Sequence, residues 1–356
     1  MKRTTLFLLL VAFAGCLTAY SQKKEAPERQ GWHKAFGSLY GDVDSVSYAL
    51  SDKFGEIVKE KKCVKVCKFN SKGDVIEDVH YSSNGSMCAK YTYKYDSKGN
   101  MIEETHYYGE DSLWRRKYIY KYDSKGNKIE ETDGHGDGKI IWKYDSQGNM
   151  IEMVDWSWSL QSIKYLYKYD SQGNKIEEAK YDGYGSLDWK ALYKYNSQGN
   201  VIEEARFWGN GSLRGKTLYK YDLQGNKIEE AYDNGDGIIQ VSHLCKYDSK
   251  GDKIEEVRYN SNGSLRGKTL YKYDVQGNMI EKAAYHGDGS LRGKTLYKYD
   301  VQVNIVEVAK YNGNGSLSSK YLYKYDSQGN WTEFIEYKSD IMTPVKMIER
   351  TIVYRK

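Results

Sequence analysis

The stretch LYKYDSQGNKIEE, Leu166–Glu178, recurs in near copies through most of this chain. If the tyrosine of its KYD triplet is taken as an anchor, eleven copies are found, spaced by 26, 27, 22, 25 and then six times 26 residues. A fixed period between about 20 and 50 residues indicates a repeat array. The anchors are Phe69, Tyr95, Tyr122, Tyr144, Tyr169, Tyr195, Tyr221, Tyr247, Tyr273, Tyr299 and Tyr325.

Each repeat predicts a β-hairpin. In one copy, KTLYKYD (Lys216–Asp222) has the pattern of a strand, and KIEEA (Lys227–Ala231) begins a second one. Between them lies LQGN, in which Gly225 and Asn226 can adopt positive φ. A short loop of this kind joins two antiparallel strands.

A lysine and a glutamate fix the register of the hairpin. Lysine precedes the anchor in all eleven copies, and glutamate stands eight residues after it in all eleven. A four-residue loop makes the two direct cross-strand partners, as in Lys220 with Glu229. An exposed pair contributes about 0–1 kcal/mol. We interpret this ladder as structural, because eleven near-identical copies cannot all be an active site.

The same register pairs Tyr221 with Ile228 and Leu218 with Ala231, so that apolar rows lie on both strand faces. A flat sheet of about 22 such strands would extend roughly 100 Å. Open sheets rarely exceed about ten strands without curling. The expected fold is therefore all-β: an antiparallel β-hairpin repeat array coiled into a spiral or partly closed roll.

The two ends of the array and one turn depart from the pattern. Residues 22–60 are expected to form a degenerate N-terminal half-unit or cap around KFGEIVK (Lys53–Lys59), residues 61–330 the hairpin repeats, and residues 331–356 C-terminal capping strands. Val303 stands where the other ten copies have glycine. A β-branched residue is costly at positive φ, so this turn is expected to be rearranged.

The N-terminus predicts export. Lys2 and Arg3 precede an apolar run, residues 6–14, that is too short to span a bilayer as a helix. One interpretation is a signal peptide, residues 1–21, cleaved after Ser21. The other is a lipoprotein box, FAGC, with a lipid anchor on Cys16. In both cases the mature protein is expected to be periplasmic, at the cell surface or extracellular.

Composition and motifs exclude several function classes. The chain of 356 residues has 36 tyrosines and only 2 prolines, which argues against disorder. Its 54 basic and 49 acidic residues are evenly mixed, so no basic block predicts nucleic-acid binding. No zinc spacing, nucleophile elbow or nucleotide-binding fingerprint occurs, and we expect neither an enzyme nor a cofactor. Two glycine-rich segments, Asp133–Gly138 and Asp233–Gly237, fit turns better than calcium loops.

The repeat resembles a known family. YKYDSQGNKIEE is similar to the tyrosine–aspartate (YD, or Rhs-type) repeats of secreted and surface bacterial proteins, and the chain resembles their small exported Bacteroidetes members over roughly residues 50–356. The resemblance implies spirals of β-hairpins. Large members form shells around toxins, and others are described as sugar-binding or surface-attached. This chain has Gly-Asn where many YD repeats have Gly-Arg, and it lacks room for a shell and its cargo, so encapsulation is not expected.

Tryptophans supply the candidate binding residues. Six of the eight lie between positions 114 and 208, where the repeat spacing is irregular. Trp156 and Trp158 would share a strand face and could stack against sugar rings, although tryptophans could also simply fill gaps beside shortened turns. We therefore expect an exported, non-enzymatic repeat protein that binds carbohydrate, or alternatively a scaffold for an envelope protein partner. The candidates are Trp114, Trp142, Trp156, Trp158, Trp189 and Trp208.

Overall fold

The structure, a computed structural model, describes residues 39, 41–51, 62–82, 84–109, 114–134, 138–156, 162–339 and 344–355. These residues form one antiparallel sheet of 24 strands. The strands are β1 (Val43–Ser51), β2 (Lys62–Phe69), β3 (Val75–Tyr81), β4 (Met87–Tyr95), β5 (Met101–Tyr108), β6 (Trp114–Tyr122), β7 (Lys128–Asp133), β8 (Lys139–Tyr144), β9 (Met150–Asp155), β10 (Ile163–Tyr169), β11 (Lys175–Tyr181), β12 (Leu187–Tyr195), β13 (Val201–Trp208), β14 (Leu213–Tyr221), β15 (Lys227–Asp233), β16 (Gln240–Tyr247), β17 (Lys253–Tyr259), β18 (Leu265–Tyr273), β19 (Met279–His286), β20 (Leu291–Tyr299), β21 (Ile305–Asn312), β22 (Leu317–Tyr325), β23 (Trp331–Lys338) and β24 (Lys346–Tyr354).

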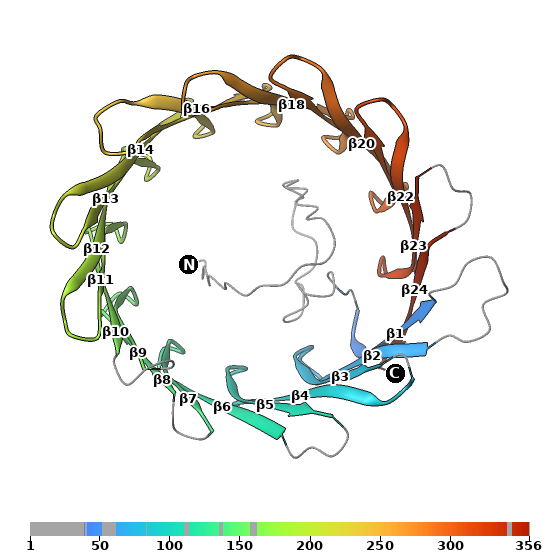
Figure 1. Cartoon of the computed structure of the whole chain (residues 1–356). Coiled ribbons are helices and arrows are strands. Elements are labelled where there is room, and N and C mark those ends of the chain that lie inside the picture. The colour runs from blue at the N-terminus through green and yellow to red at the C-terminus, as the bar shows by residue number, and fades with distance from the viewer. Residues whose placement is uncertain are drawn as a thin grey trace.

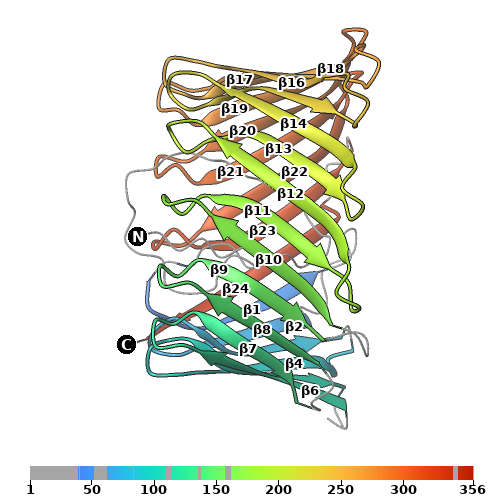
Figure 2. The ribbon, with the colours of Figure 1, turned by 90° about the vertical axis from the view of Figure 1, so that its left-hand side faces the viewer.

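The sheet closes into a barrel. Strand β1 pairs with β2 on one side and with β24 on the other, from Val43 opposite Tyr354 to Ser51 opposite Met347. Figure 1 shows the ring end-on, and Figure 2 shows the strands running obliquely to its axis. The all-β hairpin array is confirmed, whereas the expected spiral or partly closed roll is wrong. Closure leaves no described strand with an unpaired edge, which an open array would have at each end.

The size of the ring follows from its strand number. Strands spaced about 4.8 Å apart and tilted as in other barrels give a wall about 40–50 Å across. Side chains on the inner face cannot fill a ring of that width. The wall is therefore a single layer with two distinct faces, and the only compact apolar cluster among the described residues lies where the ring closes.

The turns explain why aspartate, glycine and asparagine recur. The backbone N–H of Asp222 donates to the carbonyl of Asn226 at 3.0 Å, and that of Gly225 donates to the carbonyl of Asp222 at 3.1 Å. Gly225 has φ of 85°. One carboxylate oxygen of Asp222 accepts the backbone N–H groups of Gln224 and Asn226. The aspartate of each YD pair thus organises its own turn.

Val303 keeps the geometry of the other turns. Its N–H donates to the carbonyl of Asp300 at 3.0 Å, and the N–H of Asp300 donates to the carbonyl of Asn304 at 2.9 Å. Its φ is 67°, in the left-handed region. The expected rearrangement is not seen. The ladder on both sides of the turn holds the backbone in place, so the strain remains in Val303.

Replacing Val303 with glycine is expected to raise the free energy of unfolding by about 1 kcal/mol, because glycine adopts this φ without a steric cost. Urea denaturation of the two proteins measures the change. Val301→Gly is the matched control: Val301 is 99% exposed in the same turn and has no positive φ. That control should show no gain, and equal effects of the two substitutions would contradict stored strain at Val303.

The observed register confirms two expected pairs and corrects the third. Lys220 faces Glu229 and Leu218 faces Ala231, as the repeat predicts. Tyr221 faces Lys227 rather than Ile228, because a register shift follows Lys220. The shift is a β-bulge, in which one strand contributes an extra residue.

Chirality decides which face of the wall points inward. Successive strands follow one another clockwise in Figure 1, and the turns that follow the anchor tyrosines lie at the left-hand end in Figure 2, where the C-terminus is marked. Consider a strand of L-residues that runs upward. Where a side chain points toward the viewer, the backbone N–H and C=O groups of the same residue point to the right. Lys220 directs these groups toward β15, so Lys220 and Glu229 lie on the outer face. Tyr219, Tyr221 and Glu230 lie on the inner face.

The compact cluster at the seam lies on the inner face. Leu39, just before β1, is buried together with Val46, Tyr48 and Phe69. The chain enters β1 from the inner side of the ring (Figure 1). Trp331, Ile352 and other partly buried side chains of β23 and β24 pack against this cluster, so the two ends of the array share one core.

The terminal regions meet rather than standing at opposite ends. Within residues 22–60, β1 is the described strand, and residues 331–356 contribute β23 and β24. The expected signal peptide (1–21), Cys16 and the Lys53–Lys59 segment lie outside the described residues. None of the described residues forms a helix long and apolar enough to cross a membrane.

Candidate binding surface on the inner wall

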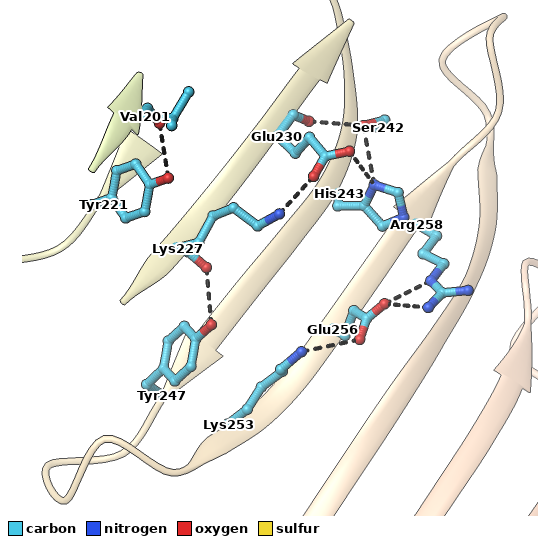
Figure 3. Close-up of polar contacts among 10 residues, drawn as sticks. All are labelled: Val201, Tyr221, Lys227, Glu230, Ser242, His243, Tyr247, Lys253, Glu256 and Arg258. Carbon is cyan, nitrogen blue, oxygen red and sulfur yellow. Dashed lines mark hydrogen bonds and ion pairs between the residues drawn. The ribbon is translucent and has the colours of Figure 1, made fainter. Parts of the chain in front are cut away.

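Each anchor tyrosine ties its hairpin to the preceding one. The Tyr221 hydroxyl donates to the carbonyl of Val201 at 2.8 Å, and the Tyr247 hydroxyl donates to the carbonyl of Lys227 at 3.0 Å (Figure 3). Burial raises the pKa of Tyr247 to about 12, so it stays a neutral donor. The same bond is made by Tyr95, Tyr122, Tyr144, Tyr169, Tyr195, Tyr273, Tyr299 and Tyr325. The sequence pattern did not reveal this contact, because it joins residues about one repeat apart.

Carboxylates on the inner wall are paired with cations. The Lys227 ammonium lies 2.7 Å from the Glu230 carboxylate, and His243 approaches the same carboxylate at 3.7 Å (Figure 3). Glu256 lies 2.6 Å from the Arg258 guanidinium. Burial alone would raise the pKa of Glu256, but the Arg258 hydrogen bond and the nearby Lys253 charge outweigh it and hold the pKa below its usual range. Glu256 is therefore an ionised member of an ion pair.

The outer face carries the expected charged ladder. Lys220 lies 2.9 Å from Glu229, and Lys298 lies 3.0 Å from Glu307. Glu307 also meets Lys320 of the next strand at 3.1 Å, a second contact that the register of one hairpin does not predict. The ladder therefore crosses from hairpin to hairpin on the outside of the ring.

The structure brings some of the candidate tryptophans together. Trp189 and Trp208 face each other across β12 and β13, and Trp189 meets the edge of Tyr165 at 6.4 Å between ring centroids. The Arg214 guanidinium lies 4.3 Å from the Trp208 ring centroid. We call Tyr165, Trp189 and Trp208 the aromatic cluster; Tyr165 and Trp189 lie on the inner face and Trp208 at the end of its strand.

Other candidates stand apart from that cluster. Trp142 is half-buried on the inner face of β8, with the Lys128 ammonium 4.4 Å from its ring centroid. Trp156 follows β9 and is 36% exposed. Trp114 begins β6. Trp158 lies outside the described residues, so the Trp156–Trp158 platform stays a prediction.

Reactive or metal-binding groups are few in the described part of the chain. Cys67 is buried, and burial raises the pKa of its thiol to about 12, whereas Cys245 is only half-buried. No group of three or more His, Cys, Asp or Glu side chains among the described residues is arranged to hold a metal ion. In the Asp233–Gly237 segment, the Asp233 carboxylate accepts the N–H groups of Gly235 and Gly237 and so caps a turn.

Comparison with known proteins gives distant structural similarities. No protein-family model matches the chain, and no curated protein matches its sequence. The crystal structure of TcdB2-TccC3-Cdc42 is 12% identical with a TM-score of 0.37, covering 81% of this chain and 20% of that one. The structure of the Photorhabdus luminescens Tc holotoxin pore is 12% identical with a TM-score of 0.37, covering 79% of this chain and 19% of that one. The crystal structure of a porin-like protein from Bacteroides uniformis is 10% identical with a TM-score of 0.25, covering 88% of this chain and 98% of that one.

The chain spans about a fifth of the length of the first two structures. At TM-scores below 0.5, the three structures assign it neither a family nor an activity.

Proposed function

We propose that this protein is an exported, non-enzymatic repeat barrel that binds carbohydrate at the aromatic cluster of Tyr165, Trp189 and Trp208. The supporting observation is that Trp189 and Trp208 are direct cross-strand partners and that Trp189 meets the edge of Tyr165. Trp208 is 45% exposed, so its ring is accessible to a ligand. Aromatic rings of this kind give large apolar contact area to the C–H faces of sugars.

Neighbouring groups suit such a ligand. Tyr184, in the turn between β11 and β12, is 82% exposed, and Arg214 beside Trp208 offers hydrogen-bond donors. A polysaccharide could contact several of these groups at once. A non-enzymatic role is supported by the pairing of Glu256 with Arg258, which holds the pKa of this carboxylate below its usual range and leaves it poorly suited to proton transfer.

A glycan array with residues 22–356 tests the proposal. Wild-type protein should bind a defined set of glycans, and Trp208→Ala should reduce that binding at least about tenfold, as expected for loss of a stacked aromatic anchor. Trp189→Phe keeps an aromatic ring in the half-buried position and should reduce binding less. Unchanged thermal midpoints would show that both variants remain folded.

Trp156→Ala is the matched control, because it removes an exposed tryptophan outside the cluster. It should bind like wild type. Absence of binding to any glycan would overturn the carbohydrate proposal, and loss of binding in Trp156→Ala alone would move the site to the Trp156–Trp158 segment.

A protein partner in the envelope is the second candidate. Leu223, Val275 and Val301 are 94%, 91% and 99% exposed at turns on the same end of the ring. Apolar side chains so exposed are typical of interaction surfaces when they gather on one side. A defined envelope protein that co-purifies with wild type, but not with the variant carrying serine at all three positions, would favour this role.

Export and processing are part of the proposal. A signal peptide cleaved after Ser21 would give a mature chain that begins at Gln22, whereas lipoprotein processing would leave acylated Cys16 at the N-terminus. The intact mass of the protein purified from its own cells distinguishes the two forms. A full-length, cytoplasmic chain would contradict both.

A further inference from the structure

Two lysines break the charge pattern of the inner wall. In six hairpins the residue nine positions after the anchor is glutamate, as at Glu230, whereas one hairpin has Lys282 at this position. Lys282 faces Tyr271 across β18 and β19, so it lies on the inner face of the wall. Lys310 of β21 lies on the same face, because Lys282 and Lys310 are both direct cross-strand partners of Thr295.

Neither lysine is paired with a carboxylate in the described part of the chain. The Lys282 ammonium lies 5.7 Å from the ring centroid of Tyr271, and the Lys310 ammonium lies 5.1 Å from that of Tyr321. A ring contact of this kind leaves the three N–H donors of an ammonium available to water or to a ligand. Lys282 is exposed and Lys310 is half-buried, so both can meet a ligand on this face.

Strands β18–β22 carry no carboxylate on the inner face. Their acidic residues are Glu281 and Glu307, and both belong to the outer ladder, where each lies 3.0 Å from its partner, Lys272 or Lys298. The next inner-wall carboxylates along the sheet are on β17 and β23, each two strands from the nearer of the two lysines. This part of the inner wall therefore carries a net positive charge, which attracts anions.

The spacing of the two lysines indicates the form of the ligand. They stand on either side of β20, about 10 Å apart at Cα, since neighbouring strands are about 4.8 Å apart. Their side chains lean in opposite directions, toward Tyr271 on β18 and Tyr321 on β22. A ligand with several anionic groups along its length can contact both ammonium groups, and the Thr295 hydroxyl between them is a further donor.

We propose that the inner wall over β18–β22 binds a polyanionic chain, in which Lys282 and Lys310 each contact one anionic group. An ammonium is a flexible point charge without the planar fork of arginine, so it pairs with sulfate and phosphate groups alike. The ligand class is therefore set by repeated negative charge. The site does not rest on the proposed carbohydrate binding at the aromatic cluster, because it lies elsewhere around the ring from β10–β13 (Figure 1).

Binding of two polyanions by the mature chain, residues 22–356, tests the inference. Dextran sulfate and dextran differ in the sulfate groups, and inorganic polyphosphate supplies repeated phosphate without a sugar. In calorimetric titrations at about 0.15 M salt, both polyanions should bind and dextran should not, and added salt should weaken the binding. Binding of one polyanion alone would retain the site and assign its ligand to that source. No binding of either polyanion would overturn the inference.

Matched pairs of variants separate this site from the overall positive charge of the protein. Lys282→Gln with Lys310→Gln should weaken polyanion binding at least about tenfold. Lys272→Gln with Lys298→Gln removes the same charge from the outer face of β18 and β20, and should leave the affinity within about twofold of wild type. Equal losses of affinity in the two double variants would overturn the inference.

Lys282→Glu is a second, independent variant. It introduces the side chain that six other hairpins carry at this position, so it is expected to fold, and an unchanged thermal midpoint would show this. Its affinity for polyanions should be lower than that of Lys282→Gln, because a negative charge then faces the ligand. An affinity of Lys282→Glu equal to that of wild type would overturn the role of Lys282.

Discussion

Replacing Arg355 with alanine is expected to lower the free energy of unfolding by about 2–3 kcal/mol and to open the seam of the ring. One guanidinium nitrogen of Arg355 donates to the Asp42 carboxylate at 2.5 Å and to the carbonyl of Val43 at 2.9 Å. The other donates to the carbonyl of Phe69 at 2.5 Å. One side chain after β24 therefore holds the ends of β1 and β2, and hydrogen bonds from charged groups contribute about 1.5–3 kcal/mol each before solvent screening.

Two measurements separate local opening from general destabilisation. Urea denaturation gives the change in free energy, and hydrogen exchange reports where the amides lose protection. The β1 and β24 amides should exchange fastest in Arg355→Ala. Arg266→Ala, an exposed arginine on β18, should change stability by less than about 0.5 kcal/mol. Equal protection of the seam in both variants would contradict the role of Arg355.

Acid should destabilise the barrel through its outer ladder. Hydrogen bonds from Lys117 and Lys94 lower the pKa of Glu103, and those from Lys121 and Lys139 lower the pKa of Glu130. A carboxylate whose pKa is lower in the folded state stabilises folding above its unfolded pKa, which is about 4.3 for glutamate. That stabilisation is lost as the pH falls through the folded pKa. The ladder glutamates with a lowered pKa are Glu77, Glu103, Glu130, Glu152 and Glu307.

The expected acid profile is flat from about pH 6 to 8, begins to fall near pH 4.5 and continues to fall below it. Solvent screening limits each glutamate to at most about 0.5 kcal/mol, so the five together account for about 1–2 kcal/mol. Denaturation at several pH values measures the profile, and Glu103→Gln should flatten part of it. A main loss of stability between pH 6 and 7 would point to histidines instead and contradict this account.

The hairpin was readable from the sequence because its determinants are local. The invariant Lys–Glu pair fixed the register of Lys220 with Glu229, and the glycine of each turn marked the positive φ. The bulge that pairs Tyr221 with Lys227 was missed, since a one-residue shift leaves the periodic pattern unchanged. The expected rearrangement of the Val303 turn was wrong, because the hydrogen bonds of the surrounding ladder outweigh the backbone preference of a single valine.

Closure and the binding surface depend on longer-range geometry. Whether an array ends as a spiral or a ring depends on a small rotation per strand, about 15° on average for 24 strands in a full turn. No local motif encodes the total rotation of the 24 strands, which decides whether the ring closes. The seam contacts of Arg355 join residues more than 280 positions apart. The pairing of Trp189 with Trp208 follows from the repeat register, and that register could have singled out these two among the tryptophans.

Closure of the ring is the central claim, and a disulfide across the seam tests it most directly. Ser47 and Thr351 are direct partners between β1 and β24 on the outer face. If the ring is closed, the double variant Ser47→Cys with Thr351→Cys will form an intramolecular disulfide under mild oxidation. Peptide mass spectrometry of the monomer detects this cross-link. The control variant, Ser47→Cys with Val353→Cys, places the two cysteines out of register and will not form it. Absence of the in-register cross-link in folded, monomeric protein would contradict closure and restore an open spiral.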